Sequence, residues 1–221
     1  MGLLKYINNY TFKTYGDMMD YIISAVRTPA PGKTQMLLKT VVSDFEKNVG
    51  RGMVTFGNTG LIISHNPIEN ADALEQMQDS FLEGNSVAES LAKQEADCSE
   101  PIRFLIREII ATIDPDKRAS NPKYIQRFMM RAKPGKAVDL LEGLLKNHEI
   151  SDGNFNISAI AENPGILIMS KPVDHFNEIR KVSDLKSFRD SFKSKGGADL
   201  SELVASMEGR IMRIAYMNRG A

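Results

Sequence analysis

The chain has 221 residues, 42% of them hydrophobic and 25% charged, as in a globular protein with a sizeable core. Basic and acidic residues balance at 28 each, which argues against a nucleic-acid-binding surface. One cysteine and three histidines leave no zinc-spaced cluster and no internal disulfide, so we expect no metal site and a reducing, cytoplasmic location. No apolar run reaches transmembrane length and no signal peptide is evident, so we expect no membrane partner.

The first half of the chain alternates between strand and helix patterns. Residues 1–20 are expected to form an irregular or short helical lead-in. The patterns that follow predict a strand at Tyr21–Val26, a helix from Met36 that ends at Gly50 and Gly52, hairpin strands at Met53–Phe56 and Leu61–Ser64, helices at Ala71–Leu82 and Val87–Glu95, and an apolar run at Ile102–Ile113. The last run begins with strand alternation, but from Arg107 onward its pattern also fits a helix.

The stretch that begins at Tyr21 occurs a second time from Tyr124, 103 positions later. Tyrosine, isoleucine, Pro-Gly-Lys and Leu-Leu recur in register, with Pro31-Gly32-Lys33 matching Pro134-Gly135-Lys136. This motif is not a phosphate-binding loop, because Arg27 stands where such a loop needs glycine. We interpret both copies as turns between a strand and a helix, although an anion at the helix start beside either lysine is the alternative.

The second half repeats the order of the first. The predicted elements are strands at Tyr124–Met130, Phe155–Ala161, Ile166–Ser170 and Arg210–Tyr216, and helices at Val138–Asn147, Asp174–Phe192 and Asp199–Met207. From Gly165 onward the match to the first half slips by two residues, which indicates an insertion in a loop. We therefore predict two units, residues 1–114 and 124–221, joined by a linker at 115–123.

Strand-helix-strand-strand-helix-strand is the order of a ferredoxin-like unit, an antiparallel sheet with both helices on one face. The predicted fold class is α+β, with two tandem units whose sheets pack face to face as a barrel-like pseudo-dimer. In element order and duplication the chain resembles the dimeric α+β barrel superfamily, in the tandem form of NIPSNAP-like and chlorite-dismutase-like proteins. Members of that superfamily include haem enzymes, monooxygenases that act on polyketide-like aromatics, and proteins of no known activity.

Candidate site residues follow from the histidines and the strand arginines. His65 comes at the end of a predicted strand near a barrel mouth, where it could be a haem ligand or a general base; a surface histidine is the alternative. Several arginines lie on or beside the first and last strands of the units: Arg27, Arg103, Arg107, Arg127, Arg131, Arg210 and Arg213. An inward guanidinium could bind an acidic ligand, whereas an outward one would be part of the solvated face.

The predicted ligand-binding residues are Arg27, Arg103, Arg131, His175 and Arg210, with His65 as the catalytic candidate. Three hypotheses of function remain open. The first is binding of a small apolar or aromatic molecule between or inside the sheets. The second, implied by the resemblance, is a haem-dependent or cofactor-free oxygenase, monooxygenase-like if the chain is an enzyme; no cofactor is predicted from the residues, and haem enters only through the resemblance. The third is a non-catalytic assembly module, and in each case we expect a homo-oligomer.

Overall fold

The computed structural model describes residues 19–48, 51–57, 59–84, 86–113, 119–146, 155–179 and 199–219. Several predictions fall outside the described residues: the lead-in up to residue 18, the helix end at Gly50, the linker residues 115–118, and the predicted helix Asp174–Phe192 beyond Ile179.

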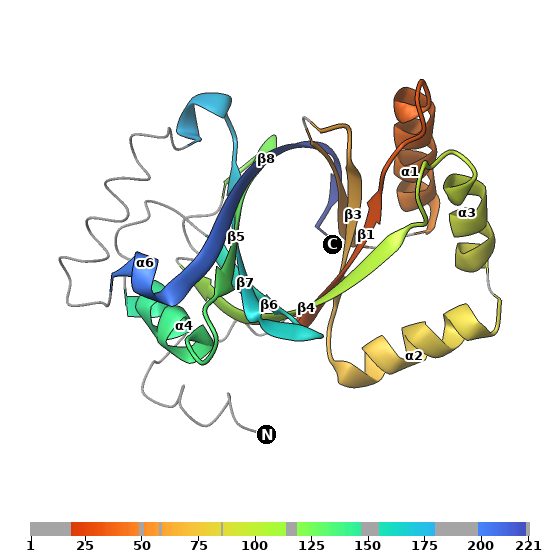
Figure 1. Ribbon diagram of the computed structural model, residues 1–221. Helices are drawn as coiled ribbons and strands as arrows, with labels where there is room; N and C mark the ends of the chain where they lie inside the picture. The colour runs from red at the N-terminus through yellow and green to blue at the C-terminus, as the bar shows by residue number, and fades with distance from the viewer. Residues whose placement is uncertain are drawn as a thin grey trace.

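Eight antiparallel strands form the molecule's centre, and the helices lie outside them (Figure 1). The first unit contains β1 (Tyr21–Arg27), α1 (Thr34–Asn48), β2 (Gly52–Gly57), β3 (Ile62–Ile68), α2 (Ala71–Leu82), α3 (Ser86–Glu95) and β4 (Arg103–Ile113). The second contains β5 (Tyr124–Ala132), α4 (Ala137–Lys146), β6 (Phe155–Ile160), β7 (Asn163–Val173), the 3-10 turn η4 (Phe176–Glu178), α6 (Leu200–Leu203) and β8 (Val204–Asn218).

The strands close a barrel in the order β1-β3-β2-β8-β5-β7-β6-β4. Each unit supplies a sheet of ferredoxin-like order, with the first and third strands of the unit in the middle. The two sheets face each other and join at their edges, where β2 pairs with β8 and β4 pairs with β6. The predicted α+β class and barrel-like pseudo-dimer are thus confirmed, and closure by edge pairing satisfies backbone groups that two separate sheets would leave exposed.

Strand alternation divides side chains between the interior of the barrel and its helix-covered outside. In the first unit Leu37 and Val41 of α1 are fully buried against Val54 and Ile62. In the second, α4 supplies the larger cluster, whose buried members include Leu140, Leu144, Met130 and Leu167. Helix amphipathicity and strand alternation therefore build two outer cores, one on each side of the barrel. In Figure 1 α1, α2 and α3 lie on one side and α4 and α6 on the other.

The two-residue slip in the repeat lies in the hairpin between β6 and β7. Phe56 pairs with Ile62 in the first unit, and Ala159 pairs with Leu167 in the second. The intervening segment thus gains two residues, while the strands on either side keep their register. A turn absorbs the insertion because its length is not fixed by ladder pairing.

Four elements differ from the sequence-based expectation. β3 continues through Pro67 to Ile68, and β4 is a strand along its whole length, Ile109 and Ala111 included. The predicted helix Asp199–Met207 is helical only at Leu200–Leu203, because Val204 onward pairs with β5 as part of β8. The predicted turn at Glu162–Gly165 is shorter than expected, since β7 begins at Asn163. In each case ladder pairing with a neighbouring strand overrides the local pattern.

Candidate functional site

A layer of polar side chains crosses the interior of the barrel around His65, which is buried at 3% exposure. His65 lies opposite Ser24 in the β1–β3 ladder, and the Ser24 Oγ is 2.8 Å from its Nδ1. From β2, the Thr55 Oγ1 is 3.3 Å from its Nε2. Hydroxyl groups can donate or accept, so the two contacts together satisfy the one N–H and one lone pair of a neutral imidazole.

The pKa of His65 is lowered well below its usual 6.5, chiefly by burial and then by the positive charges of Arg127 and Arg107. A desolvated imidazole close to two cations loses free energy when it takes up a proton. His65 is therefore neutral at physiological pH, a hydrogen-bonding group rather than a cation.

Arg107 of β4 brings a guanidinium into the same layer and is only 3% exposed. Its Nη1 donates to the Ser158 Oγ at 3.3 Å and its Nη2 to the Ser24 Oγ at 3.4 Å. Burial lowers its pKa to about 10, so it stays charged at neutral pH. The Arg107 Nε has no hydrogen-bond partner among the described residues. A buried donor without a partner destabilises a protein by about 1 to 3 kcal/mol, and by more when the group is charged. This nitrogen is therefore a position where an acceptor would be stabilising.

A second guanidinium, that of Arg127 on β5, enters from the opposite wall. Its Nε donates to the Ser170 Oγ at 3.1 Å. Its pKa lies well below the usual value, first because of burial and then because Arg107 and Arg210 repel its charge. The Arg210 Nε in turn donates a hydrogen bond to the Glu208 Oε1 at 2.7 Å.

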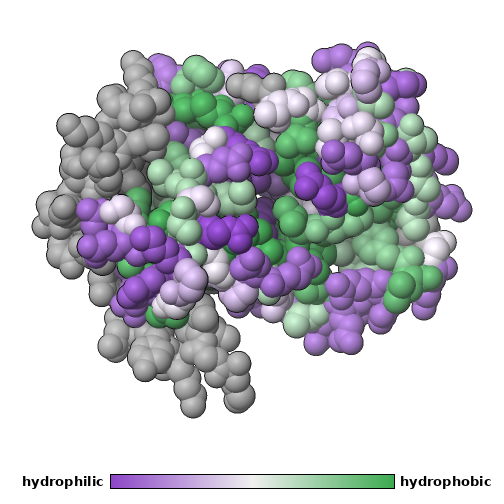
Figure 2. Space-filling view, in the orientation of Figure 1, coloured by the Kyte–Doolittle hydropathy of each residue, from purple (hydrophilic) through white to green (hydrophobic). Residues whose placement is uncertain are grey.

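Part of this layer, namely Ser24, Arg107 and Arg127, lines a cavity with about 510 Å³ of empty space including its opening, whereas His65 is not among the lining residues. Its apolar wall consists of Val26, Ile63, Leu105, Met129, Ile168 and Met212. Its polar wall consists of Ser24, Arg107, Arg127, Glu208 and Arg210, that is, one hydroxyl, three guanidiniums and one carboxylate. Figure 2, in the orientation of Figure 1, shows hydrophobic and hydrophilic side chains side by side over the centre of this face. The cavity can thus hold an apolar body and, through its excess positive charge, an anionic group.

The polar layer joins positions that are equivalent in the two repeats but differ in chemistry. Ser24 and His65 of the first unit correspond in register to Arg127 and Ser170 of the second, since each pair lies directly opposite in its ladder. The Ser24 hydroxyl and the His65 imidazole thus lie across the barrel from the Arg127 guanidinium and the Ser170 hydroxyl. The fold is pseudo-symmetric, whereas the site inside it is not.

The predicted site residues are distributed over different parts of the molecule. His65 lies inside the barrel, in the middle of β3 rather than at a strand end, and Arg210 lines the cavity. Arg103 and Arg131 are exposed residues of β4 and β5, and His175 is exposed next to η4. Of the six, only Arg210 lines the cavity, and His65 lies in the polar layer without lining it.

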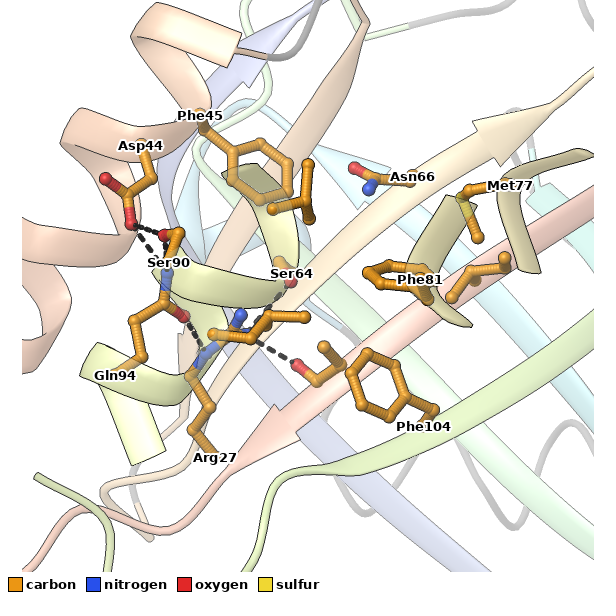
Figure 3. Close-up of a pocket in the computed structure, with 14 residues that line it drawn as sticks. Arg27, Asp44, Phe45, Ser64, Asn66, Met77, Phe81, Ser90, Gln94 and Phe104 are labelled. Atoms are coloured by element: carbon orange, nitrogen blue, oxygen red, sulfur yellow. Dashed lines mark hydrogen bonds between the residues drawn. The ribbon is translucent and has the colours of Figure 1, made fainter. Parts of the chain in front are cut away.

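Arg27 lies on the outer face of β1, beneath α3, in a second pocket of the first unit (Figure 3). Its Nε donates to the Gln94 Oε1 at 2.7 Å, and its Nη1 donates to the Ser64 Oγ and the Ala25 carbonyl, both at 3.0 Å. Gln94 extends this network by donating to the Asp44 carboxylate at 2.7 Å. The charge of Arg27 is thus balanced within the protein, and the side chain ties α3 to the sheet.

Sequence reasoning named Arg107 and Arg127 among the strand arginines but did not select them, and it missed Ser24, Thr55, Ser158 and Ser170. For the two arginines, the signal that could have found them is the period of two. Arg127 and Met129 alternate with Phe128 and Met130, and a polar residue in phase with the inward set faces the interior.

The site offers no ligand for haem iron or for a metal ion. Both ring nitrogens of His65 lie at hydrogen-bond distance from hydroxyl groups, and two nearby guanidiniums disfavour added positive charge. These residues do not fit a haem. Within the part of the chain that the structure describes, no three histidine, cysteine, aspartate or glutamate side chains gather as metal ligands. No helix in that part is both long and apolar enough to span a membrane.

Comparison with known proteins shows the fold. No family model matches the chain, and neither does any curated protein sequence. Among solved structures, an "anthrone oxidase-like protein" superposes with a TM-score of 0.63 at 11% identity, covering 93% of this chain and 97% of its own. Two proteins named "putative monooxygenase" also superpose. That from Lactobacillus acidophilus has a TM-score of 0.62 at 9% identity, covering 91% and 98%. That from Fusobacterium nucleatum has a TM-score of 0.67 at 9% identity, covering 91% and 96%. These similarities show the fold, an α+β architecture with a closed eight-strand antiparallel barrel.

Proposed function

We propose that the barrel binds a small molecule with a largely apolar body and one acidic group, such as a carboxylate or an ionised phenol. The observation that carries the proposal is the unpaired Nε of buried Arg107. An anionic oxygen would supply the missing acceptor and offset the excess positive charge of the cavity. The apolar wall would take up the body of the molecule. This keeps the predicted small-molecule function and adds a charge to the expected ligand.

The test uses two probes of one shape, naphthalene-2-carboxylate and naphthalene-2-carboxamide, measured by calorimetry. We expect the carboxylate to bind at least about tenfold more tightly, because charge-assisted hydrogen bonds contribute more than neutral ones. Arg107→Met should abolish this preference. Arg103→Met is the matched control, since Arg103 is four residues away on the same strand, exposed and outside the cavity lining.

Equal binding of the two probes, or a preference that survives in Arg107→Met and disappears in Arg103→Met, would reject the proposal. A native mass spectrum of the protein from its own source organism gives an independent check. We expect one retained organic acid per chain. Resemblance to the NIPSNAP-like or chlorite-dismutase-like branch is not required for either result and stays a prediction, as does the cytoplasmic location.

A cofactor-free oxygenase is the second candidate, favoured by the location of His65 inside the barrel and by the names of the similar structures. In such a reaction His65 would accept a proton from the substrate, the arginines would hold the resulting anion, and molecular oxygen would be the co-reactant. The depressed pKa of His65 makes it a weak base, so only an acidic substrate could be deprotonated at neutral pH. This favours binding over catalysis.

Oxygen consumption with an anthrone as the substrate separates the two candidates. Turnover that disappears in His65→Ala, while the variant still binds naphthalene-2-carboxylate, would establish the oxygenase. Turnover that is unchanged in this variant would exclude His65 as the base.

A further inference from the structure

β8 is longer than the strand beside it and leaves part of one edge without a partner. On one side it pairs with β5 from Val204 to Arg213. On the other it pairs with β2 only from Met212 to Asn218. Within the described part of the chain, no strand pairs with residues 204–211 on that second side. Unpaired amide and carbonyl groups in an extended strand are a template for a further strand.

The same segment is exposed on both of its faces. Every side chain from residue 205 to 210 is exposed, including Met207 at 42%. Alternation would bury one face of an ordinary barrel strand. We infer that β8 pairs with β8 of a second copy of this chain, antiparallel about a two-fold axis at Gly209, so that the two barrels form a homodimer.

Symmetry and charge select this register. Directly opposite residues of an antiparallel pair lie on the same face of the sheet, and a two-fold axis perpendicular to the sheet preserves that face. The axis must therefore lie midway between the two copies of one residue, which are directly opposite each other. An axis at Glu208 would place two carboxylates directly opposite each other, which is destabilising. An axis at Gly209 places Glu208 opposite Arg210 of the second copy, and Arg210 opposite its Glu208. The contact then contains two pairs of directly opposite residues with opposite charges.

The other face of the segment fits the same register. Met207 and Ile211 flank Gly209 there, so each methionine comes opposite an isoleucine of the second copy. At the axis the two glycines meet without side chains, which allows a close backbone approach. Both faces of the edge are therefore self-complementary.

The first unit does not offer an equivalent edge. β4 extends past its pairing with β6 only over Arg103–Ile106, a segment with one cation and no carboxylate. Self-pairing there would bring arginine charges together without compensation, which is the usual protection of a sheet edge. The dimer edge is thus a property of the second unit alone.

The edge borders the mouth of the cavity, because Glu208 and Arg210 also line it. A second copy paired at Gly209 would bring its own Glu208 and Arg210 to that mouth. The dimer itself is independent of the proposed ligand, so either could be wrong without the other.

Sedimentation equilibrium on the full chain tests the dimer with two charge reversals. Glu208→Arg makes the segment all positive and Arg210→Glu makes it all negative, so we expect each variant alone to be monomeric. An equimolar mixture should recover the dimer mass, because each position then faces the opposite charge. The double variant with both reversals should also dimerise, with circular dichroism showing that all variants fold.

A wild-type protein that sediments as a monomer would overturn the inference. So would a dimer that persists in both single variants, since it would have to use another surface. Single variants that stay monomeric when mixed would also reject this register.

Discussion

The neutral state of His65 makes the stability of the protein depend on pH in a defined direction. In the unfolded chain an imidazole titrates near pH 6.5, whereas in the barrel its pKa lies well below that value. Below pH 6.5 the unfolded state therefore binds the extra proton. Because of this group, the free energy of unfolding should fall by about 1.4 kcal/mol for each unit by which the pH is lowered below 6.5. Above pH 6.5 the group should contribute no slope.

Urea denaturation at several pH values between 7.5 and 5 checks this expectation. His65→Gln keeps a group that can donate and accept hydrogen bonds but removes the titration. The slope of its free energy of unfolding against pH should therefore be smaller than that of the wild type by the contribution of one proton. Parallel profiles for the two proteins would show that His65 has an ordinary pKa in the folded state.

At the level of single residues, the sequence identified the residue types of the site better than their positions. The choice of His65 and strand arginines as site residues stays a prediction, and the structure places His65, Arg107 and Arg127 in one polar layer. Arg27 could not be separated from Arg107 by sequence, since both sit in alternating strands and only the helices covering one face decide which side is the interior. Ser24 and Thr55 carried no signal, because a hydroxyl in a strand is equally common on either face.

At the level of elements, the two Pro-Gly turns are the most direct structural record of the duplication. Gly32 has a φ of 78° and Gly135 a φ of 73°, and each is followed by a lysine whose amide closes the turn at 2.9 Å. Both are in the left-handed region, where a Cβ is unfavourable even though no atom lies within 4 Å of it.

We therefore expect Gly32→Ala and Gly135→Ala to lower the free energy of unfolding by about 1 kcal/mol each, measured by urea denaturation. The strain is in the backbone, so the two costs should be alike despite different neighbours. Gly57→Ala is the control, because Gly57 has no positive φ and a Cβ there makes only ordinary contacts, the nearest at 3.7 Å. A cost in only one of the two turns would mean that the repeats have diverged in backbone conformation.

Elements were predictable where one side faced a helix-covered core and uncertain where it did not. The helix Ala71–Leu82 was predicted with its observed bounds, since its apolar period is clear and Asn70 caps it by accepting from the Ala73 amide. The predicted start of the last strand at Arg210 was wrong, because residues 205–210 have no buried face and therefore no hydrophobic period of two. The interior of β4 was ambiguous for another reason: its register shifts between Ile109 and Ala111, which breaks the alternation.

At the level of the whole molecule, the barrel belongs to both units, and this bears on how it unfolds. Each unit alone would leave unpaired the edges that now join β2 to β8 and β4 to β6. We expect a single cooperative transition in urea, although the outer cores are separate. Leu37 and Leu140 are both fully buried, one in each core. Leu37→Ala and Leu140→Ala should each cost about 3 kcal/mol and shift the same transition.

Near-ultraviolet circular dichroism and tyrosine fluorescence, recorded on the same samples, would show whether the two probes coincide. Two separated transitions in either variant would mean that residues 1–114 and 124–221 unfold independently, as separate domains would. The boundary between the units, which the repeat indicates, stays a prediction. The barrel-like arrangement of the two sheets was predicted, but the edge pairing of β4 with β6 that closes the barrel was not, because no local pattern describes it.

The unequal chemistry of equivalent positions has a consequence for how a guest would be oriented. A cage with true two-fold symmetry accepts a guest equally well in two poses, related by half a turn, and so cannot distinguish its ends. Ser24 and Arg127 occupy equivalent positions, as do His65 and Ser170, yet only one side of the lumen offers the Arg127 guanidinium and only the other offers imidazole. If the proposed ligand binds here, such a lumen would accept it in one pose and expose one face of a planar guest, a selectivity that an identical pair of units would lack.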